Sequence, residues 1–320
     1  MLVRLGSRWA SFCIRASPRR EHPTSTSQGG MTVKYALLDL PTRVDAAVAN
    51  AARAEAAGLD RYMVAQVERA DPIAVLAVVA DRVPRIELAT GVIAIQSTLP
   101  QHLAQQARTV NQVSGGRFTL GIGVCHQPIV TEAFGLEWSR PYSHMVQYLD
   151  ALLPLLDGQA VDVSGDLVSH RTEIEVPGPA PGVMLAAMGP RMLALAGDRT
   201  DGTLLAWTGP RTIAEHVRPA IGDGLVSAAV WVCVTGDAEE ARARLGDQLA
   251  GYRTLPSYQA MAERERVADM MDLLAVGNPD EVRAELARYA EASADEIAVI
   301  LQGTPAEREA GWALLEEGLT

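Results

Sequence analysis

Residues 100–123 read PQHLAQQARTVNQVSGGRFTLGIG, and this stretch holds one repeat of the pattern that decides the fold. Leu103, Ala107 and Val110 recur at helical spacing on one face, after a proline that suits a first helical turn. Two glycines end this pattern, and the apolar run that follows has the length of a buried strand. The stretch therefore predicts a helix that leads the chain back to a parallel strand.

The same alternation of short aliphatic runs with Ala-rich helical stretches extends from Val33 to the end of the chain. It predicts a parallel sheet with helical crossovers. Most strands begin about 20 to 30 residues apart, which is the length of a strand, a helix and two short loops. Eight such units favour an α/β fold of the (β/α)8 TIM barrel type over two doubly wound halves. The predicted strands are residues 33–39, 61–66, 86–92, 117–123, 183–188, 203–207, 227–234 and 296–301.

Two connections are longer than a single crossover and predict insertions into the barrel. Residues 124–182 contain a predicted helix from Tyr142 to Leu156 and then an alternating stretch around Gly165, which suggests a hairpin. Residues 235–295 have helical patterns and are predicted to be helical. A dinucleotide-binding interpretation of GIGVCH is weak, because the third glycine of that fingerprint is absent.

Composition excludes several classes of partner. The 320 residues are 48% hydrophobic, which is enough for a substantial core, and the formal charge of −11 gives little support to a nucleic-acid partner. No apolar run reaches the roughly 20 residues that cross a bilayer. Cys13, Cys125 and Cys233 lack metal-ligand spacing and indicate a reducing, cytoplasmic compartment without a disulfide framework.

The first 30 residues differ from the rest, with five arginines and one acid. They are either an Arg- and Ser-rich targeting segment or a disordered or non-native extension, and we favour the second because no continuous apolar region is present. Met31 opens a stretch that already has the pattern of a first strand. Residues 31–320 are therefore expected to form a single domain.

In a TIM barrel, functional residues gather where the strands end. These ends carry few carboxylates, no nucleophile elbow, no paired acids and no metal cluster. They therefore offer few of the groups that hydrolysis and metal catalysis need. Glycines, backbone polar groups and apolar surface remain, which suits a flat cofactor. The predicted strand ends carry Asp39, Gln66, Thr90, Gly91, Val92, Cys125, His126, Met188, Gly189, Pro190, Arg191, Trp207 and Thr208.

Several of these residues permit two interpretations. In LAAMGPRM (residues 185–192), Gly189 and Pro190 either punctuate a turn or, with Arg191, hold an anion at the start of a helix. His126 is either a structural hydrogen-bonding group or a proton donor. Trp207 either covers a substrate or packs beneath a loop.

Three stretches together resemble the luciferase-like monooxygenase superfamily, and more closely its branch of oxidoreductases that use the deazaflavin coenzyme F420. They are SGGRFTLGIGVCHQPIV, the earlier strand ATGVI, and LAAMGPRMLALAGDRTDGTLLAWTGPRT. The resemblance extends from Val33 to the C-terminal helix, about nine-tenths of the chain. It implies a bacterial luciferase-like (β/α)8 barrel with insertions, usually a homodimer, with a planar ring at the strand ends.

The resemblance also implies roles for individual residues. A cis non-proline peptide near Gly91 and Val92 would support the ring, and Gln66 and Thr90 would line its edge. The segment matching the family's phosphate-binding turn is Gly189, Pro190, Arg191 and Met192. His126 would be the catalytic proton donor or acceptor, while Asp39, Cys125 and Trp207 would line the site of a small organic substrate.

The resemblance implies hydride transfer with coenzyme F420 as the leading hypothesis. A monooxygenase that uses FMN and oxygen is the alternative, because both rings fit similar barrels. A non-catalytic protein that binds the cofactor is a third possibility.

Overall fold

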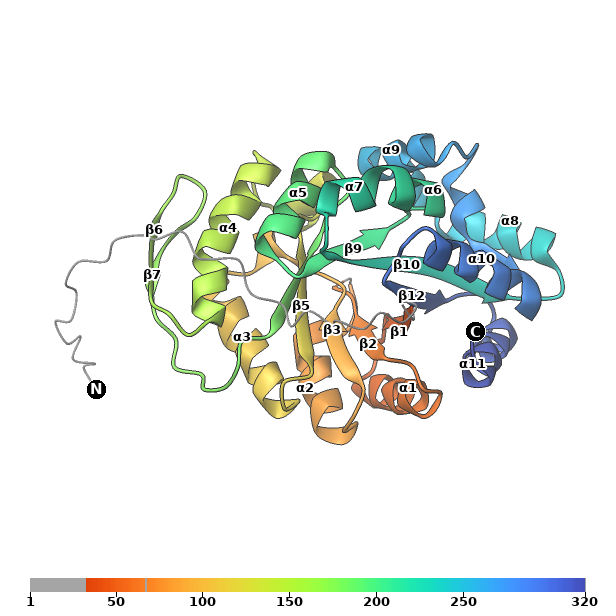
Figure 1. Cartoon of the computed structure of the whole chain (residues 1–320), viewed down its shortest axis with the longest axis horizontal. Helices are drawn as coiled ribbons and strands as arrows, with labels where there is room; N and C mark the ends of the chain where they lie inside the picture. The colour runs from red at the N-terminus through yellow and green to blue at the C-terminus, as the bar shows by residue number, and fades with distance from the viewer. Residues whose placement is uncertain (1–32, 67, 320) are drawn as a thin grey trace.

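Eight parallel strands close into a barrel in the computed structural model, which describes residues 33–66 and 68–319. Pairing of β9 with β10 completes the ring, so the predicted (β/α)8 fold is confirmed. The prediction for residues 1–30 lies outside the described residues. Figure 1 shows the helices arranged around these strands. In ring order the strands are β1 (Lys34–Asp39), β2 (Arg61–Val64), β3 (Glu87–Thr90), β5 (Phe118–Gly123), β8 (Gly182–Ala186), β9 (Gly202–Ala206), β10 (Leu225–Val234) and β12 (Glu296–Leu301).

Local sequence explains where the surrounding helices begin. Many start with proline in the first turn, where the missing N–H costs no hydrogen bond. Asn278 and Thr304 also accept hydrogen bonds from the N-terminal amides of their helices and form capping boxes. None of the described helices is both long and apolar enough to cross a membrane. The crossover helices are α1 (Val44–Ala56), α2 (Pro72–Arg82), α3 (Pro100–Val113), α4 (Pro141–Leu156), α5 (Pro190–Arg199), α6 (Pro210–Thr212), η3 (Ile213–Val217), α7 (Arg218–Ile221), α10 (Pro279–Glu291) and α11 (Pro305–Glu317).

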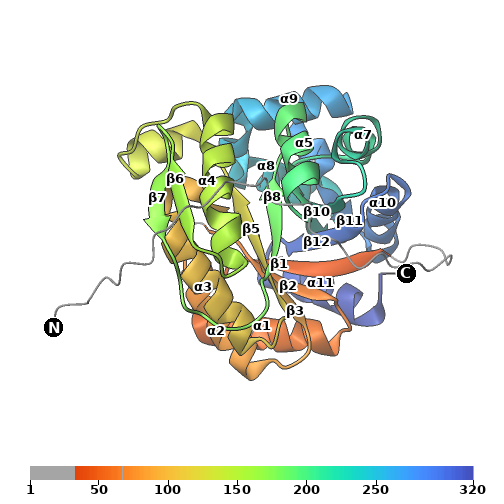
Figure 2. The same ribbon diagram turned by 60° about the vertical axis from the view of Figure 1, so that its left-hand side comes forward.

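The first insertion has the predicted form. An antiparallel hairpin of β6 (Val161–Ser164) and β7 (Ser169–Thr172) follows α4 and lies beside it in Figure 2. Arg108, on α3, donates hydrogen bonds to the carbonyls of Leu156, Val176 and Gly178. These bonds tie the end of α4 and the segment after β7 to α3.

The second insertion differs from its prediction in one element. Most of it is helical, but β11 (Ala275–Gly277) pairs with the last three residues of the long strand β10. A strand of three residues is too short to show a period of its own, and its pairing depends on the overhanging end of β10. The short β4 (Ile93–Ala94) was missed for the same reason. The remaining elements are η1 (Ile95–Ser97), η2 (Ile129–Ala133), α8 (Ala238–Gln248), η4 (Ala250–Thr254), α9 (Pro256–Glu265) and η5 (Met270–Leu273).

Alternate residues of each strand face two separate apolar cores. Leu37 packs in the larger cluster, which also holds buried helix residues, whereas its neighbours Ala36 and Leu38 belong to a second cluster. This alternation is expected for a strand with both faces buried. The second cluster fills the barrel interior, so the barrel is a packed core with a floor on which a site can be built. Its interior strand residues include Ala36, Leu38, Met63, Ala89, Met184, Leu204 and Ala298.

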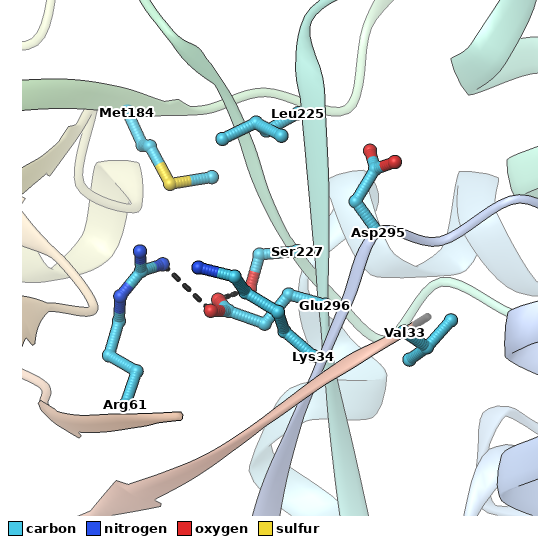
Figure 3. Close-up of a pocket in the computed structure, with 8 residues that line it drawn as sticks. All are labelled: Val33, Lys34, Arg61, Met184, Leu225, Ser227, Asp295 and Glu296. Carbon is cyan, nitrogen blue, oxygen red and sulfur yellow. Dashed lines mark hydrogen bonds and ion pairs between the residues drawn. The ribbon is translucent and has the colours of Figure 1, made fainter. Parts of the chain in front are cut away.

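The N-terminal end of the barrel is closed by ionic groups. Arg61 is 7% exposed and donates to Glu296 at 2.7 Å and to Glu87 at 2.6 Å, while Ser227 donates to Glu296 at 2.7 Å. Figure 3 shows Arg61, Glu296, Ser227 and Lys34 pointing toward one another. These four residues are part of the lining of a cavity of about 200 Å³. Because both carboxylates already have cationic or hydroxyl partners, this end of the barrel has a structural role.

Replacement of Arg61 by Met is expected to lower the free energy of unfolding by about 3–5 kcal/mol, because the buried Glu296 loses its cation. Arg82→Met is the matched control, since Arg82 and its partner Asp81 are both exposed, and it is expected to cost less than about 1 kcal/mol. Denaturant unfolding of both variants measures the difference. Equal costs would contradict a stabilising role for the Arg61 network.

Candidate functional site

The end of β3 carries the most unusual backbone of the barrel mouth. The peptide bond between Gly91 and Val92 is cis, as the resemblance implied. The Gly91 N–H donates to the Val64 carbonyl at 2.9 Å, and the Gln66 N–H donates to the Val92 carbonyl at 3.2 Å. A Cβ on Gly91 would lie 2.9 Å from Cδ1 of Leu38. The main chain therefore rests directly on the packed interior and forms a platform at the rim.

Two polar side chains predicted at the edge of this platform hold the platform itself. The Gln66 side-chain oxygen accepts from the Ala94 N–H at 2.7 Å. The Thr90 hydroxyl, fully buried, donates to the Gly121 carbonyl and accepts from the Gly121 N–H, both at 2.8 Å. Both side chains thus fix neighbouring main chain around the Gly91–Val92 bond.

The loop after β5 supplies the titratable groups of the mouth. His126 places Nε2 at 3.2 Å from the Tyr258 hydroxyl, and burial lowers the pKa of His126. Cys125 is half-buried, its N–H donates to the Gln96 side chain at 3.1 Å, and burial raises the pKa of its thiol. Both side chains are therefore favoured in their neutral forms.

The predicted anion-binding turn lies at the start of α5. Gly189 precedes the helix without a side-chain cap, and the Arg191 guanidinium lies 4.1 Å above the centre of the Tyr142 ring. The Met188 carbonyl accepts from Arg264 at 3.0 Å, which brings a second guanidinium beside the turn. Amides at a helix start that lack a cap, with cations nearby, form a favourable site for an anion.

A second turn of the same sequence type shows how such a start holds an anion. Gly209, Pro210 and Arg211 begin α6, and the carboxylate of Glu265 accepts from the N–H groups of Arg211 at 3.1 Å and Thr212 at 2.8 Å. A Cβ on Gly209 would lie 2.3 Å from the Glu265 carboxyl carbon. The carboxylate thus occupies the space directly beside this glycine.

The turn at Gly189 leaves the corresponding space open. No described atom lies within 4 Å of the position of a Cβ on Gly189, apart from its chain neighbours. Its φ of −87° is also accessible to other residues, so backbone conformation does not require glycine there. The residues present at Gly189 to Met192 therefore fit a phosphate, as their counterparts at α6 fit a carboxylate.

The remaining predicted residues lie at the rim but have protein partners. The Asp39 carboxylate accepts from the Tyr62 hydroxyl at 2.7 Å and from the Asn50 side chain at 2.8 Å. Trp207 is 1% exposed and stacks on Trp231 with ring centres 4.0 Å apart. Trp207 is therefore packed within an aromatic cluster that includes Trp231 and Tyr258.

Sequence reasoning missed three residues of α9 that lie at the mouth: Tyr258, Arg264 and Glu265. The residue pattern of α9 indicates a helix, but it does not predict that this helix packs over the ends of β5, β8 and β9. Among the residues that the structure describes, no three His, Cys, Asp or Glu side chains gather as a metal site. The groups assembled here can bind an anion, support a flat ring and exchange a proton.

Comparison with known proteins identifies the family. A family model described as luciferase-like monooxygenase matches residues 18–296. The chain belongs to this family. An uncharacterised protein of Mycobacterium tuberculosis is 27% identical over 256 residues, which cover 72% of this chain and 75% of that protein. A putative coenzyme F420-dependent oxidoreductase of the same organism is 27% identical over 63% of this chain and 66% of its own length.

Solved structures of other proteins share the fold. The coenzyme F420-dependent tetrahydromethanopterin reductase of Methanopyrus kandleri superposes with a TM-score of 0.77 at 18% identity, covering 89% of this chain and 97% of that chain. A type II Baeyer–Villiger monooxygenase of Pseudomonas putida, in complex with FMN, gives a TM-score of 0.70 at 16% identity, with 89% and 96% covered. The fold alone is therefore shared by proteins that use either ring.

Substitution by alanine is expected to affect stability very differently at two glycines of the barrel strands and their ends. A Cβ on Gly121 would lie 2.0 Å from the Thr90 carbonyl oxygen, so Gly121→Ala should lower the free energy of unfolding by more than about 3 kcal/mol. Gly189→Ala should change it by less than about 0.5 kcal/mol, because its Cβ meets no described atom. Denaturant unfolding of the two variants tests this, and a well-tolerated Gly121→Ala would be inconsistent with the packing of β5 on β3.

Proposed function

We propose that this luciferase-like protein is an oxidoreductase that transfers a hydride between coenzyme F420 and a small organic substrate. The observation that carries the proposal is the uncapped start of α5, with Arg191 beside it, at the rim of a barrel whose platform is main chain. The names of relatives favour F420, since they include the putative coenzyme F420-dependent oxidoreductase of Mycobacterium tuberculosis, 27% identical over 63% of this chain and 66% of that protein.

In this proposal each part of the mouth has one task. Gly189 to Met192 bind the phosphate of the cofactor, and Gly91 and Val92 support its ring. Gln66 and Thr90 hold that support in place through their hydrogen bonds to Ala94 and Gly121. A bound deazaflavin supplies the two-electron chemistry, while the protein orients the substrate and excludes water.

His126 is the group that would exchange a proton with the substrate. The lowered pKa of His126 keeps the imidazole neutral near neutral pH. The neutral imidazole can accept a proton from the substrate, and the imidazolium can return it. Asp39 and Cys125 stay predictions as substrate-lining residues, whereas the burial of Trp207 against Trp231 argues against that role for Trp207. The predicted homodimer and cytoplasmic location also stay predictions.

A flavin-dependent monooxygenase is the second candidate, favoured by the solved FMN complex with the same fold. The two differ chemically because a deazaflavin is restricted to hydride transfer, whereas a reduced flavin can activate oxygen. A protein that binds either ring without turnover is the third candidate.

Titration of the purified protein with F420 and with FMN, followed by fluorescence, separates these candidates. We expect saturable binding of F420 that is tighter than binding of FMN, and turnover that continues without oxygen. Preferential FMN binding with a strict oxygen requirement would support the monooxygenase instead. Tight binding without turnover on a broad panel of alcohols, carbonyl compounds and imines would support the non-catalytic candidate.

Arg191→Ala is expected to raise the dissociation constant of F420 by about 10- to 100-fold, because a hydrogen bond to a charged group contributes about 1.5–3 kcal/mol. Arg211→Ala is the matched control, since Arg211 occupies the same place in the turn whose amides already bind Glu265. The control should bind F420 like the unmodified protein, and both variants should unfold at nearly the same denaturant concentration. Unchanged affinity in Arg191→Ala would remove the phosphate assignment.

A further inference from the structure

His126 and Tyr258 meet across the barrel mouth. His126 follows β5, whereas Tyr258 lies on α9, which follows β10, and β8 and β9 separate these two strands in the ring. The imidazole Nε2 and the phenol oxygen are 3.2 Å apart, and the two rings pack edge to face with centres 5.1 Å apart. The contact is thus both a hydrogen bond and a packing contact.

The phenol is fixed by its neighbours. Tyr258 is 8% exposed, and its ring lies 5.8 Å from the Tyr252 ring and 6.5 Å from the Trp207 ring. Burial raises the pKa of Tyr258, so its hydroxyl stays protonated and can both donate and accept a hydrogen bond. A buried aromatic cluster therefore presents one hydroxyl to His126 in a defined position.

The other imidazole nitrogen is available for chemistry. Nδ1 of His126 makes no hydrogen bond to any group in residues 33–66 and 68–319. It is also not one of the fully buried side-chain nitrogen and oxygen atoms that lack a hydrogen-bond partner. The titratable groups beside the pair are Cys125 and Tyr252, and burial raises the pKa of each, so both remain neutral. Within the described part of the chain, no charged side chain takes the place of Tyr258 as the hydrogen-bond partner of the His126 ring.

We propose that Tyr258 is a positioning residue that binds Nε2 of His126 and thereby assigns proton exchange with the substrate to Nδ1. The inference rests on the proposed function, which requires a proton to move when a hydride moves. In this role the phenol acts through its hydrogen bond to His126.

The step balances in either direction. In oxidation, the substrate carbon–hydrogen bond breaks, and its electron pair leaves with the hydrogen to the bound ring. The proton on the adjacent oxygen or nitrogen passes to Nδ1, and Nε2–H of the resulting imidazolium donates to the phenol oxygen. In reduction, the same imidazolium returns its proton from Nδ1 to the substrate.

The test compares Tyr258→Phe with Tyr252→Phe. Phenylalanine keeps the aromatic packing and removes only the hydroxyl. Tyr252 belongs to the same cluster, and its hydroxyl makes no hydrogen bond to His126. Nitrogen-15 NMR of histidine-labelled protein without cofactor reports the tautomer and pKa of His126, and a His126→Asn spectrum assigns its signals.

Tyr258→Phe should lower the pKa of His126 by on the order of half a unit to one unit, because the imidazolium loses a charge-assisted hydrogen bond. It should also mix the two neutral tautomers, whereas Tyr252→Phe should change neither property. An unchanged tautomer and pKa in Tyr258→Phe would overturn the inference. This comparison needs no cofactor, so it tests the role of Tyr258 even if the protein binds neither F420 nor FMN. Failure to bind either cofactor would count against the proposed function and not against the role of Tyr258.

Kinetics with the cofactor that binds supply the second measurement. Tyr258→Phe should lower kcat about three- to tenfold with KM unchanged, because the protonated His126 loses one hydrogen bond. The limb of the pH profile that reports His126 should move to lower pH. A lowered kcat with an unmoved pH profile would indicate a purely structural role and overturn the inference.

Discussion

Closure of the sheet is the constraint on which the rest of the structure depends. A parallel strand at an open edge leaves its backbone groups without partners, and pairing of β9 with β10 removes that edge. Closure also forces the ends of all eight strands to a single mouth, so residues distant in sequence become neighbours. The contact between His126 and Tyr258, 132 positions apart, exists only because the ring is closed.

Packing inside the ring then determines what the mouth can be made of. Large side chains cannot fit where strands approach closely, and a Cβ on Gly121 would overlap the Thr90 carbonyl oxygen. The rim is therefore built largely from main chain, which side chains such as Thr90 and Gln66 hold in place. Main chain without protruding side chains provides a flat support. The shape that suits a planar ring is thus a consequence of a tightly filled barrel.

The sequence predicted the fold more completely than the site, for physical reasons. Each barrel strand shows its own apolar run, and proline and glycine mark the helix starts and turns, so local patterns were sufficient. Position at the rim also followed from topology, which located His126 and Gly189 to Arg191. The partners did not follow: nothing local in Glu265 says that its carboxylate binds the amides of α6, and nothing in Thr90 says that its hydroxyl turns toward Gly121. Those contacts depend on how distant segments pack.

The electrostatics of the mouth bear on which ligand it can hold. Burial favours the neutral forms of His126, Cys125 and Tyr258, so these three groups contribute no fixed charge to the mouth. A cofactor with an anionic tail must then have its charge balanced away from the ring. The turns at the starts of α6 and α5 differ in this respect. The amides at the start of α6 bind the Glu265 carboxylate. The amides at the start of α5 have no side-chain cap, and Arg191 and Arg264 lie beside them. In the proposed function, a ligand would bind through its anionic tail at the cationic turn of α5, and proton exchange would take place at the uncharged group His126, apart from that turn.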